Sequence, residues 1–152
     1  MTVDDLIAES AHLVFLQFNE DQAWDLGCRL VSMSKRAGFG VVINIRTANR
    51  TLFHASLPGS APLNDNWARR KSNTALQFQE SSLLVGTRNL ANGQTLADQG
   101  LDEADYADHG GAVPICVVGV GVVAVVAVSG LPQREDHALV VRAIIEMLGQ
   151  SL

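Results

Sequence analysis

The sequence predicts an α+β fold in which an antiparallel sheet of two hairpins is flanked by helices. Two stretches rich in β-branched residues, 41–55 and 112–128, are each interrupted by a turn signal, and helical periodicity occurs before, between and after them. The chain has 152 residues, of which 47% are hydrophobic. Because this length and composition are enough to bury one core without disulfides or metals, we expect a single domain over residues 1–152.

The N-terminal part is expected to hold two helices. Residues 2–12 place apolar side chains near helical spacing, and residues 14–18 form a short β-prone segment. Asn19 is a good helix cap, and Gln22 stands three residues later, as in a capping box. The helix that follows is expected to end at Gly38, because glycine favours the left-handed conformation of a helix stop.

The two β-rich stretches are expected to be hairpins. The first has strands at 41–45 and 51–55. The second lies within residues 110–133, which carry no formal charge and are long enough to cross a bilayer as a helix. Pro114, the Gly119-Val120-Gly121 break and the high density of valine favour two strands and a tight turn instead. We therefore predict no membrane span, and a hairpin whose apolar faces are covered by helices or by another subunit.

Two further helices are expected in the second half of the chain. One runs over residues 67–80 after a Pro- and Gly-rich loop at 57–62, and its cap candidates are Asn64, Asp65 and Asn66. The sequence pattern of residues 81–91 does not distinguish one type of secondary structure from another. The last helix runs over residues 133–148, with an apolar face that includes His137.

Composition and motifs exclude several classes of protein. Lys and Arg number 11 and Asp and Glu 16, a net charge of −5, so the chain lacks the positive field that non-specific binding of nucleic acid or an anionic membrane requires. Cys28 and Cys116 have no zinc-like spacing and are expected to be buried free thiols. Residues 1–5 are acidic and precede no apolar signal core, which favours a cytoplasmic location. No dinucleotide-binding, P-loop, zincin or hydrolase-elbow motif occurs.

Three polar clusters are candidates for chemistry, and the first spans residues 64–71. There Arg69, Arg70 and Lys71 follow Trp67 at the expected start of a helix. Because the helix dipole disfavours cations at that end, a carboxylate or phosphate held by exposed amides, Arg70 and Lys71 would stabilise the arrangement. The alternative interpretation is a solvated face or a set of subunit contacts.

The second cluster spans residues 106–111. His109 precedes Gly110 and Gly111, and a glycine pair lets the backbone approach another group closely. A histidine at this place is a candidate ligand, proton shuttle or hydrogen-bonding group.

The third cluster spans residues 129–137, where a strand end leads into a helix N-terminus with free N–H groups. Asp136 is either a helix-starting acid or a site residue, and His137 is either a site residue or a satisfied core histidine. Ser129 has no neighbouring His–acid pattern that would make it a nucleophile. His54, in the first hairpin, is equally undecided.

In their order, these segments resemble the haem-degrading-domain family, which includes HbpS, GlcG and the C-terminal domain of PduO. The resemblance covers about residues 20–150, and the combination of motifs is more specific than any one of them. The Asn-Asp-Asn-Trp and Asp-His elements are similar to a mostly uncharacterised intracellular branch. The segments that carry the resemblance are Phe53-His54-Ala55 with Leu57-Pro58-Gly59, Asn64-Asp65-Asn66-Trp67 with Arg69-Arg70-Lys71, His109-Gly110-Gly111 with Pro114-Ile115, and Val128-Ser129-Gly130-Leu131-Pro132 with Asp136-His137.

The resemblance implies a profilin-like α-β-α sandwich that assembles into a large homo-oligomer. Some relatives bind haem, release its iron or sense redox stress, and others have no known activity, so haem is the cofactor that the resemblance suggests. Haem-binding residues vary among relatives, and the resemblance therefore implies no particular iron ligand. The Arg69-Arg70-Lys71 element is not general to haem binders, which is a departure of this sequence from the family pattern.

The leading hypothesis is an intracellular, oligomeric protein that binds a small anionic, haem-like ligand between the helix at 67–71, the loop at 109–111 and the last helix. In this hypothesis Arg70 and Lys71 pair with carboxylates, Trp67 stacks on the ligand, and His109 or His137 is the ligand or acid–base group. No metal site is predicted. The candidate ligand-binding residues are Trp67, Arg70, Lys71, His109, Gly110, Gly111, Asp136 and His137.

Two alternatives stay open. In the first, the protein is an enzyme that uses His109, His137 and Asp136 as acid–base groups or weak metal ligands, which requires the three side chains to converge. In the second, it is an interaction platform without a small ligand, and Arg69, Arg70 and Lys71 form salt bridges between subunits.

Overall fold

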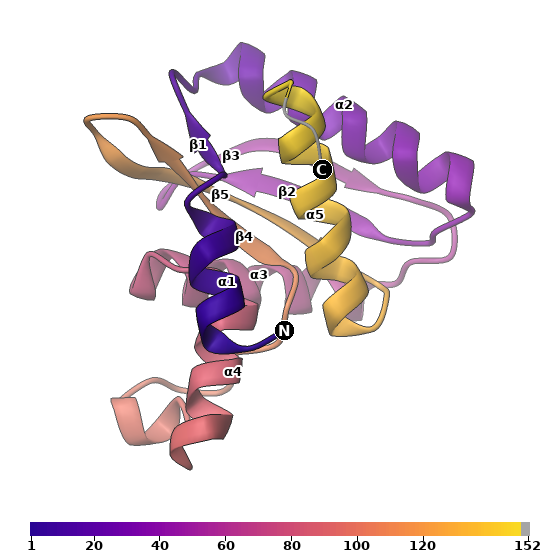
Figure 1. Cartoon of the computed structure of the whole chain (residues 1–152). Coiled ribbons are helices and arrows are strands. Elements are labelled where there is room, and N and C mark those ends of the chain that lie inside the picture. The colour runs from indigo at the N-terminus through magenta and orange to yellow at the C-terminus, as the bar shows by residue number, and fades with distance from the viewer. Residues whose placement is uncertain (150–152) are drawn as a thin grey trace.

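In residues 1–149, which the computed structural model describes, five strands form one sheet in the order β1-β4-β5-β2-β3, with helices on both faces (Figure 1). The expected α+β class is confirmed. The strands are β1 (Val14–Phe15), β2 (Val42–Arg46), β3 (Thr51–Ser56), β4 (Ala112–Val117) and β5 (Gly121–Ser129). The helices are α1 (Val3–Ser10), α2 (Glu20–Ala37), α3 (Pro62–Phe78), α4 (Ser82–Asn92) and α5 (Gln133–Met147), with a 3₁₀ turn η1 at Ala97–Gln99.

The sheet is mixed, which corrects the expectation of a purely antiparallel sheet. Both predicted hairpins form, and β2 joins them by pairing antiparallel with β5. The short segment after α1, however, becomes β1 and pairs parallel with β4, with Val14 opposite Cys116. A strand of two residues carries too little pattern to indicate its direction, and the parallel pairing depends on the long chain path between β1 and β4.

Each face of the sheet has its own cover. α2 and α5 pack on one face, where Leu30 and Ile144 are fully buried with Ile43 and Val126 of the strands. α3 packs on the other face through small side chains such as Ala68. These side chains form one cluster with the strand residues that point to that face. Because successive strand residues point to opposite faces, the valine-rich β5 is covered on both sides along most of its length. No helix within residues 1–149 is long and apolar enough to cross a membrane.

The predicted ends of α2 are confirmed. Asn19 Oδ1 accepts hydrogen bonds from the N–H groups of Asp21 at 2.9 Å and Gln22 at 3.4 Å, and Gln22 Oε1 accepts one from the Asn19 N–H at 2.8 Å. Gly38 ends the helix in the left-handed conformation with φ 73°. Cys28, on this helix, is exposed, so the expectation of a buried thiol is wrong there, and Cys116 is half-buried.

α3 begins five residues earlier than predicted, at Pro62 instead of Trp67. Proline suits the first position of a helix because the missing N–H has no partner there in any case. Asn64 contributes to the cap from inside the helix, since its Oδ1 accepts a hydrogen bond from the Ala61 N–H at 2.9 Å. As a result Arg69, Arg70 and Lys71 lie beyond the second turn, and the argument that the dipole disfavours them does not hold.

Replacing Asn19 with alanine tests the capping box. The variant loses the acceptor for two backbone N–H groups, so we expect the free energy of unfolding to fall by about 1 kcal/mol in urea denaturation. Asn92→Ala, at the exposed C-terminal end of α4, is the matched control and is expected to change stability by less than about 0.5 kcal/mol. Equal losses in the two variants would contradict a specific capping role.

Candidate functional site

A pocket forms where three distant parts of the chain meet: α3, the segment before β4, and the junction between β5 and α5. Its volume is about 280 Å³. Most of its lining is polar, and the glycines let backbone form part of the wall. The lining residues are Asn64, Trp67, Lys71, His109, Gly110, Ser129, Gly130, Leu131, Gln133 and Asp136.

An aromatic stack stands at one side of this pocket. The rings of Trp67 and His109 are stacked with centroids 5.0 Å apart and planes inclined by 23°. The guanidinium carbon of Arg70 lies 4.6 Å from the centroid of the Trp67 ring, a cation–π contact. Arg70 Nε also donates a hydrogen bond to the Glu103 carbonyl at 2.9 Å. The stack holds His109 in place, although this histidine is exposed and its ring nitrogens have no hydrogen-bond partner among the described residues.

Two neighbouring hollows share His109 with the pocket. One, of about 230 Å³, is lined by Trp67, Arg70 and Tyr106 among others. The other, of about 270 Å³, is lined by residues that include Gln133 and Arg134. His109 therefore lies at the place where three concave surfaces meet.

The floor of the pocket is a buried lysine. The side chain of Lys71 is 3% exposed, and its Nζ donates hydrogen bonds to the Gly110 carbonyl at 3.0 Å, the Val128 carbonyl at 2.6 Å and Asp136 Oδ2 at 3.2 Å. Gly111 makes this approach feasible, because a Cβ at that position would collide with Lys71 Nζ and the residue adopts φ 135°. All three ammonium protons thus have acceptors.

The Lys71–Asp136 pair carries no net charge. Burial lowers the pKa of the Lys71 ammonium and raises the pKa of the Asp136 carboxyl, since loss of water disfavours the charged form of each group. The attraction between the two groups opposes both shifts. Asp136 Oδ1 also accepts a hydrogen bond from the Leu131 N–H at 3.0 Å, so both carboxylate oxygens are engaged within the protein.

Five of the eight candidate residues line the pocket: Trp67, Lys71, His109, Gly110 and Asp136. Arg70 lines the neighbouring hollow, and Gly111 lies behind the wall against Lys71. The expected role of Lys71 needs correction, because its ammonium is buried and fully hydrogen-bonded and does not face a ligand carboxylate.

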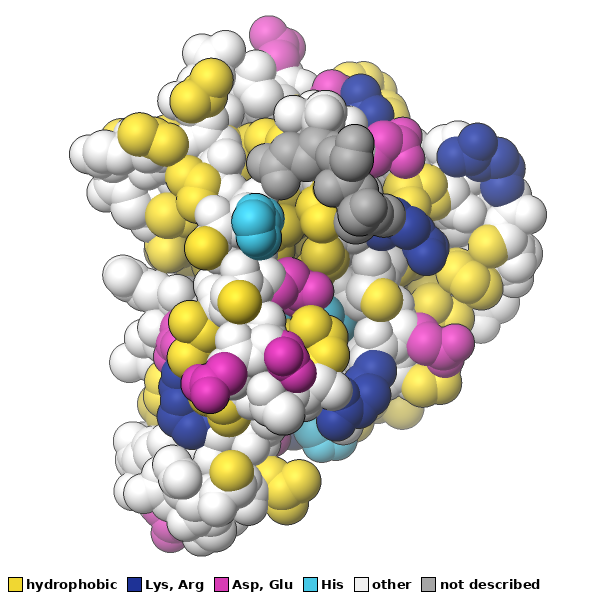
Figure 2. Space-filling model, viewed as in Figure 1, with side chains coloured by type: hydrophobic (Ala, Val, Ile, Leu, Met, Phe, Trp, Pro, Cys, Tyr) yellow, Lys and Arg dark blue, Asp and Glu magenta, His cyan; other side chains and the backbone are white. Residues whose placement is uncertain are grey.

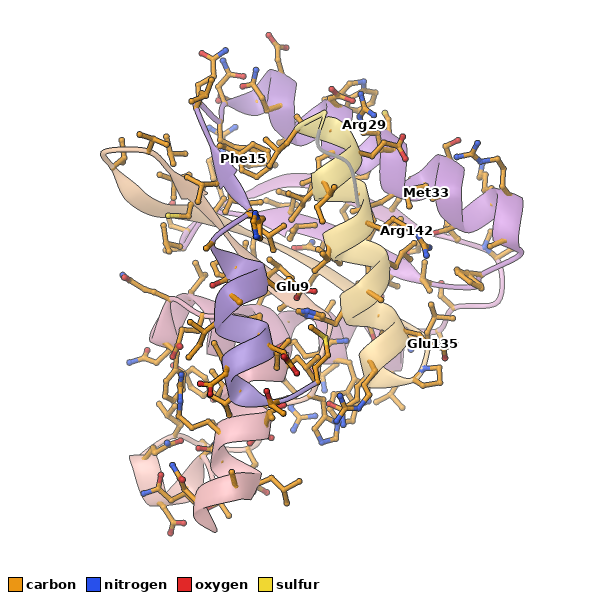
Figure 3. All side chains as sticks on the ribbon, in the orientation of Figure 1. Glu9, Phe15, Arg29, Met33, Glu135 and Arg142 are labelled. Carbon is orange, nitrogen blue, oxygen red and sulfur yellow. The ribbon has the colours of Figure 1, made fainter. Side chains whose placement is uncertain are left out.

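His137 does not take part in the pocket. Its Nε2 lies 2.6 Å from Glu9 Oε1 of α1, and Glu9 is seen between α1 and α5 in Figure 3. The side chain is 3% exposed, which makes His137 a core histidine, but its Nδ1 has no hydrogen-bond partner among the described residues, so it is not fully satisfied. His109, His137 and Asp136 therefore do not converge, and the acid–base trio of the enzyme hypothesis is not formed. Within residues 1–149, no group of three or more His, Cys, Asp or Glu side chains is arranged to hold a metal ion.

The cationic run has partners in its own chain. Arg69 pairs with Asp105 at 3.0 Å and also donates a hydrogen bond to the Ala104 carbonyl at 2.9 Å. Arg70 and Lys71 also have contacts within the chain, although the terminal nitrogens of Arg70 have no hydrogen-bond partner among the described residues. Five residues of the pocket lining are absent from the candidate ligand-binding residues: Asn64, Ser129, Gly130, Leu131 and Gln133. The period-two pattern of β5 would have indicated Ser129, because it puts this residue on the same face as Val125 and Ala127.

Lys71→Met would leave the Asp136 carboxylate buried without its cation. We expect the free energy of unfolding to fall by about 3–5 kcal/mol at neutral pH. The pKa of Asp136 would then lie further above its ordinary value of 3.8, so the folded variant binds a proton more readily than the unfolded chain. Its stability deficit should therefore shrink as the pH falls from neutral towards that value, which urea unfolding at several pH values measures.

Two controls accompany this experiment. Asp136→Asn in the Lys71→Met background removes the unpaired charge and is expected to recover most of the lost stability. Arg69→Met removes a neighbouring exposed cation and is expected to cost less than about 1 kcal/mol. Similar losses of stability for Arg69→Met and Lys71→Met would show that the buried Lys71–Asp136 pair contributes no more to stability than an exposed ion pair.

Comparisons with known proteins agree with the motif-based resemblance. A UPF0303 protein of Streptomyces coelicolor is 47% identical over 150 residues, which cover 98% of this chain and 95% of that protein. The crystal structure of the Ybr137w protein matches with a TM-score of 0.90 and 31% identity, over 98% of this chain and 88% of the other. The crystal structure of the PduOC:haem complex has the same fold, with a TM-score of 0.69 and 19% identity over 86% of this chain and 94% of the other. The family model described as "Haem degrading protein HbpS-like" matches residues 18–145. This match spans most of the chain, which therefore belongs to the HbpS-like haem-degrading family.

Proposed function

We propose that the protein binds a planar, anionic small ligand around His109. The observation that carries the proposal is the position of this exposed histidine, which is stacked on Trp67 where three hollows of about 280, 230 and 270 Å³ meet. Concave sites with an aromatic wall and a few convergent polar groups are typical of small-ligand binding. An imidazole with unpartnered nitrogens is available to ligate or to hydrogen-bond what lies above it.

Haem is the first ligand to consider, because the family description and the PduOC:haem complex both refer to it. The donor set fits this group: His109 would hold the iron, and the terminal nitrogens of Arg70, which have no hydrogen-bond partner among the described residues, would hold a propionate. Each hollow alone is below the volume of about 300–1,000 Å³ usual for ligand clefts. Haem would therefore extend over more than one of them. Bound haem would supply a redox-active iron.

Titration with haemin, followed at the Soret band, tests this proposal. We expect a saturable shift in the wild type and its loss in His109→Ala, because the imidazole is the proposed iron ligand. His12→Ala removes an exposed histidine in the turn that follows α1 and is expected to leave the shift unchanged. The absence of a saturable shift in the wild type would exclude haem, and equal shifts in the two variants would exclude His109 as the ligand.

We also propose that the chain forms a homo-oligomer through the tip of the β4–β5 hairpin. Val118 is 59% and Val120 71% exposed there. Leu16, 87% exposed, lies beside them, because the Val118 N–H donates a hydrogen bond to the Phe15 carbonyl at 2.9 Å. Figure 2 shows hydrophobic side chains gathered over this upper-left corner of the molecule. Clustered exposed apolar side chains of this kind favour contact with another protein surface.

Light scattering on variants tests the assembly. We expect the wild type to be oligomeric at micromolar concentration and the Val118→Asp, Val120→Asp double variant to have a smaller mass, since burying two carboxylates at an apolar contact is unfavourable. Leu63→Asp, at a position 64% exposed on α3, is the control and should not change the mass. A monomeric wild type would contradict this proposal without bearing on ligand binding.

A further inference from the structure

We infer that the pocket between α3 and α5 binds a carboxylate group through uncharged hydrogen-bond donors. The inference rests on the proposed function, because it names the chemical group at one end of the same ligand. It does not depend on haem, because any planar molecule that carries a carboxylate would provide the proposed group. The argument uses Ser129, two amide side chains and the N-terminus of α5.

Ser129 is a buried hydroxyl that faces the pocket. It is 3% exposed and lines the pocket, and its Oγ has no hydrogen-bond partner among the described residues. Its direction follows from the strand, because Val125 and Ala127 of β5 pack with Ala68 of α3, and Ser129 continues the same alternation. Unlike the unpartnered hydroxyls of Ser34 and Ser72, which are closed off from solvent, Ser129 Oγ remains accessible through the pocket. A ligand atom in the pocket would supply the missing partner.

Two amides on the pocket wall have NH₂ groups without a partner. Asn64 Oδ1 accepts from the Ala61 N–H at 2.9 Å, and Gln133 Oε1 accepts from the Gly110 N–H at 2.9 Å. Because backbone N–H groups are donors only, these bonds settle which end of each amide is the oxygen. The amide nitrogens have no partner among the described residues. The polar side-chain atoms of Asn64 and Gln133 that have no partner at all are therefore donors.

The N-terminus of α5 adds further donors, and its first residue, Gln133, lines the pocket. The helix has 15 residues and starts after Pro132, which supplies no side-chain cap. The N–H groups of Gln133 and Arg134 have no hydrogen-bond partner within the described chain, whereas those of Glu135 and Asp136 bond to the Pro132 carbonyl. An uncapped helix start with a positive dipole end attracts an anion. The unpartnered hydroxyl of Ser129, a residue that is 3% exposed and lines the pocket, is an independent polar group available to a ligand at this helix start.

The charges in the pocket favour a carboxylate over a phosphate. Among the described residues that line it, Lys71 is the one cation, and its protons are taken by Gly110, Val128 and Asp136. Asp136 does not repel the ligand strongly, because it is neutralised by Lys71 and its oxygens are engaged. Phosphates are usually held by Arg or Lys. A singly charged group needs only the neutral donors that are present.

The size of the pocket limits the ligand that carries this group. A cavity of about 150 Å³ holds benzene, so the 280 Å³ found here accepts one ring with a carboxylate. The Trp67 ring is already in contact with the His109 ring and the Arg70 guanidinium, so the exposed His109 is the aromatic group available to such a ring. An aromatic monocarboxylate is therefore a suitable probe, and a larger planar acid would reach the neighbouring hollows.

Isothermal titration calorimetry of the full chain tests the inference with three probes: benzoate, benzamide and inorganic phosphate. Benzoate and benzamide have nearly the same shape, but benzamide presents an NH₂ group where the pocket needs an acceptor. We expect benzoate to bind at least about tenfold more tightly than benzamide, as for the loss of a charge-assisted hydrogen bond. Equal affinity for benzoate and benzamide, or tighter binding of phosphate, would overturn the inference.

Two variants locate the binding. Ser129→Ala removes the buried hydroxyl, and Gln133→Glu replaces a donor with a negative charge while keeping an oxygen for the Gly110 N–H. Each is expected to weaken benzoate binding by about tenfold or more. Ser32→Ala and Gln17→Glu, at exposed positions outside the pocket lining, are the matched controls and should bind like the wild type. If Gln133→Glu and Gln17→Glu weaken binding equally, the effect is general electrostatics and the inference fails.

The failure of this inference can be told from the failure of the haem proposal. Benzoate binding that depends on Ser129, without a Soret shift for haemin, supports the carboxylate site and excludes haem. A Soret shift that depends on His109, with benzoate binding unaffected by Ser129→Ala, supports haem and overturns the carboxylate site. Circular dichroism and thermal unfolding of each variant confirm that a loss of binding is not a loss of fold.

Discussion

The hydrogen bonds of the Lys71 ammonium join the four parts of the chain on which the site depends. The lysine belongs to α3, and its acceptors are the carbonyl of Gly110 before β4, the carbonyl of Val128 near the end of β5 and the carboxylate of Asp136 in α5. Burying a charge is costly, and it is tolerated where the geometry satisfies every proton. Because all three are satisfied here, the ammonium fixes the relative positions of pocket walls that lie far apart in the sequence.

This arrangement also determines how an anion can be recognised. The most deeply placed cation is neutralised by Asp136, so the pocket interior offers polarity without net charge. Cations that remain accessible, Arg70 and Arg134, line the neighbouring hollows around His109. A ligand with a carboxylate in the pocket and a second acidic group outside would use both kinds of donor. The proposed site thus suits an elongated or planar acid better than a compact polyanion.

Local sequence signals predict much of the fold, and the predictions that differ from the structure do so for physical reasons. The capping box at Asn19 and the hairpin of valine-rich strands depend on neighbours in the sequence, which is why they were predictable. The start of α3 differs from the prediction because the Pro- and Gly-rich pattern at 57–62 indicates a loop, whereas Pro62 occupies the first helical position, where proline is favoured. The burial of Lys71 was not visible, since its partners lie 39 to 65 residues away.

The same long-range contacts make ligand binding a better interpretation of the site than acid–base catalysis. A general acid or base must reach the reacting atom with a free lone pair or proton. Asp136 has both oxygens engaged, and His137 contacts Glu9 under α1, outside the pocket. His109 is then the candidate with free nitrogens, and Asp136 is not positioned to orient it. An isolated imidazole beside an aromatic wall and a set of neutral donors is suited to holding a ligand, whereas the charge relay of a hydrolytic site would need a second titratable group in contact with it.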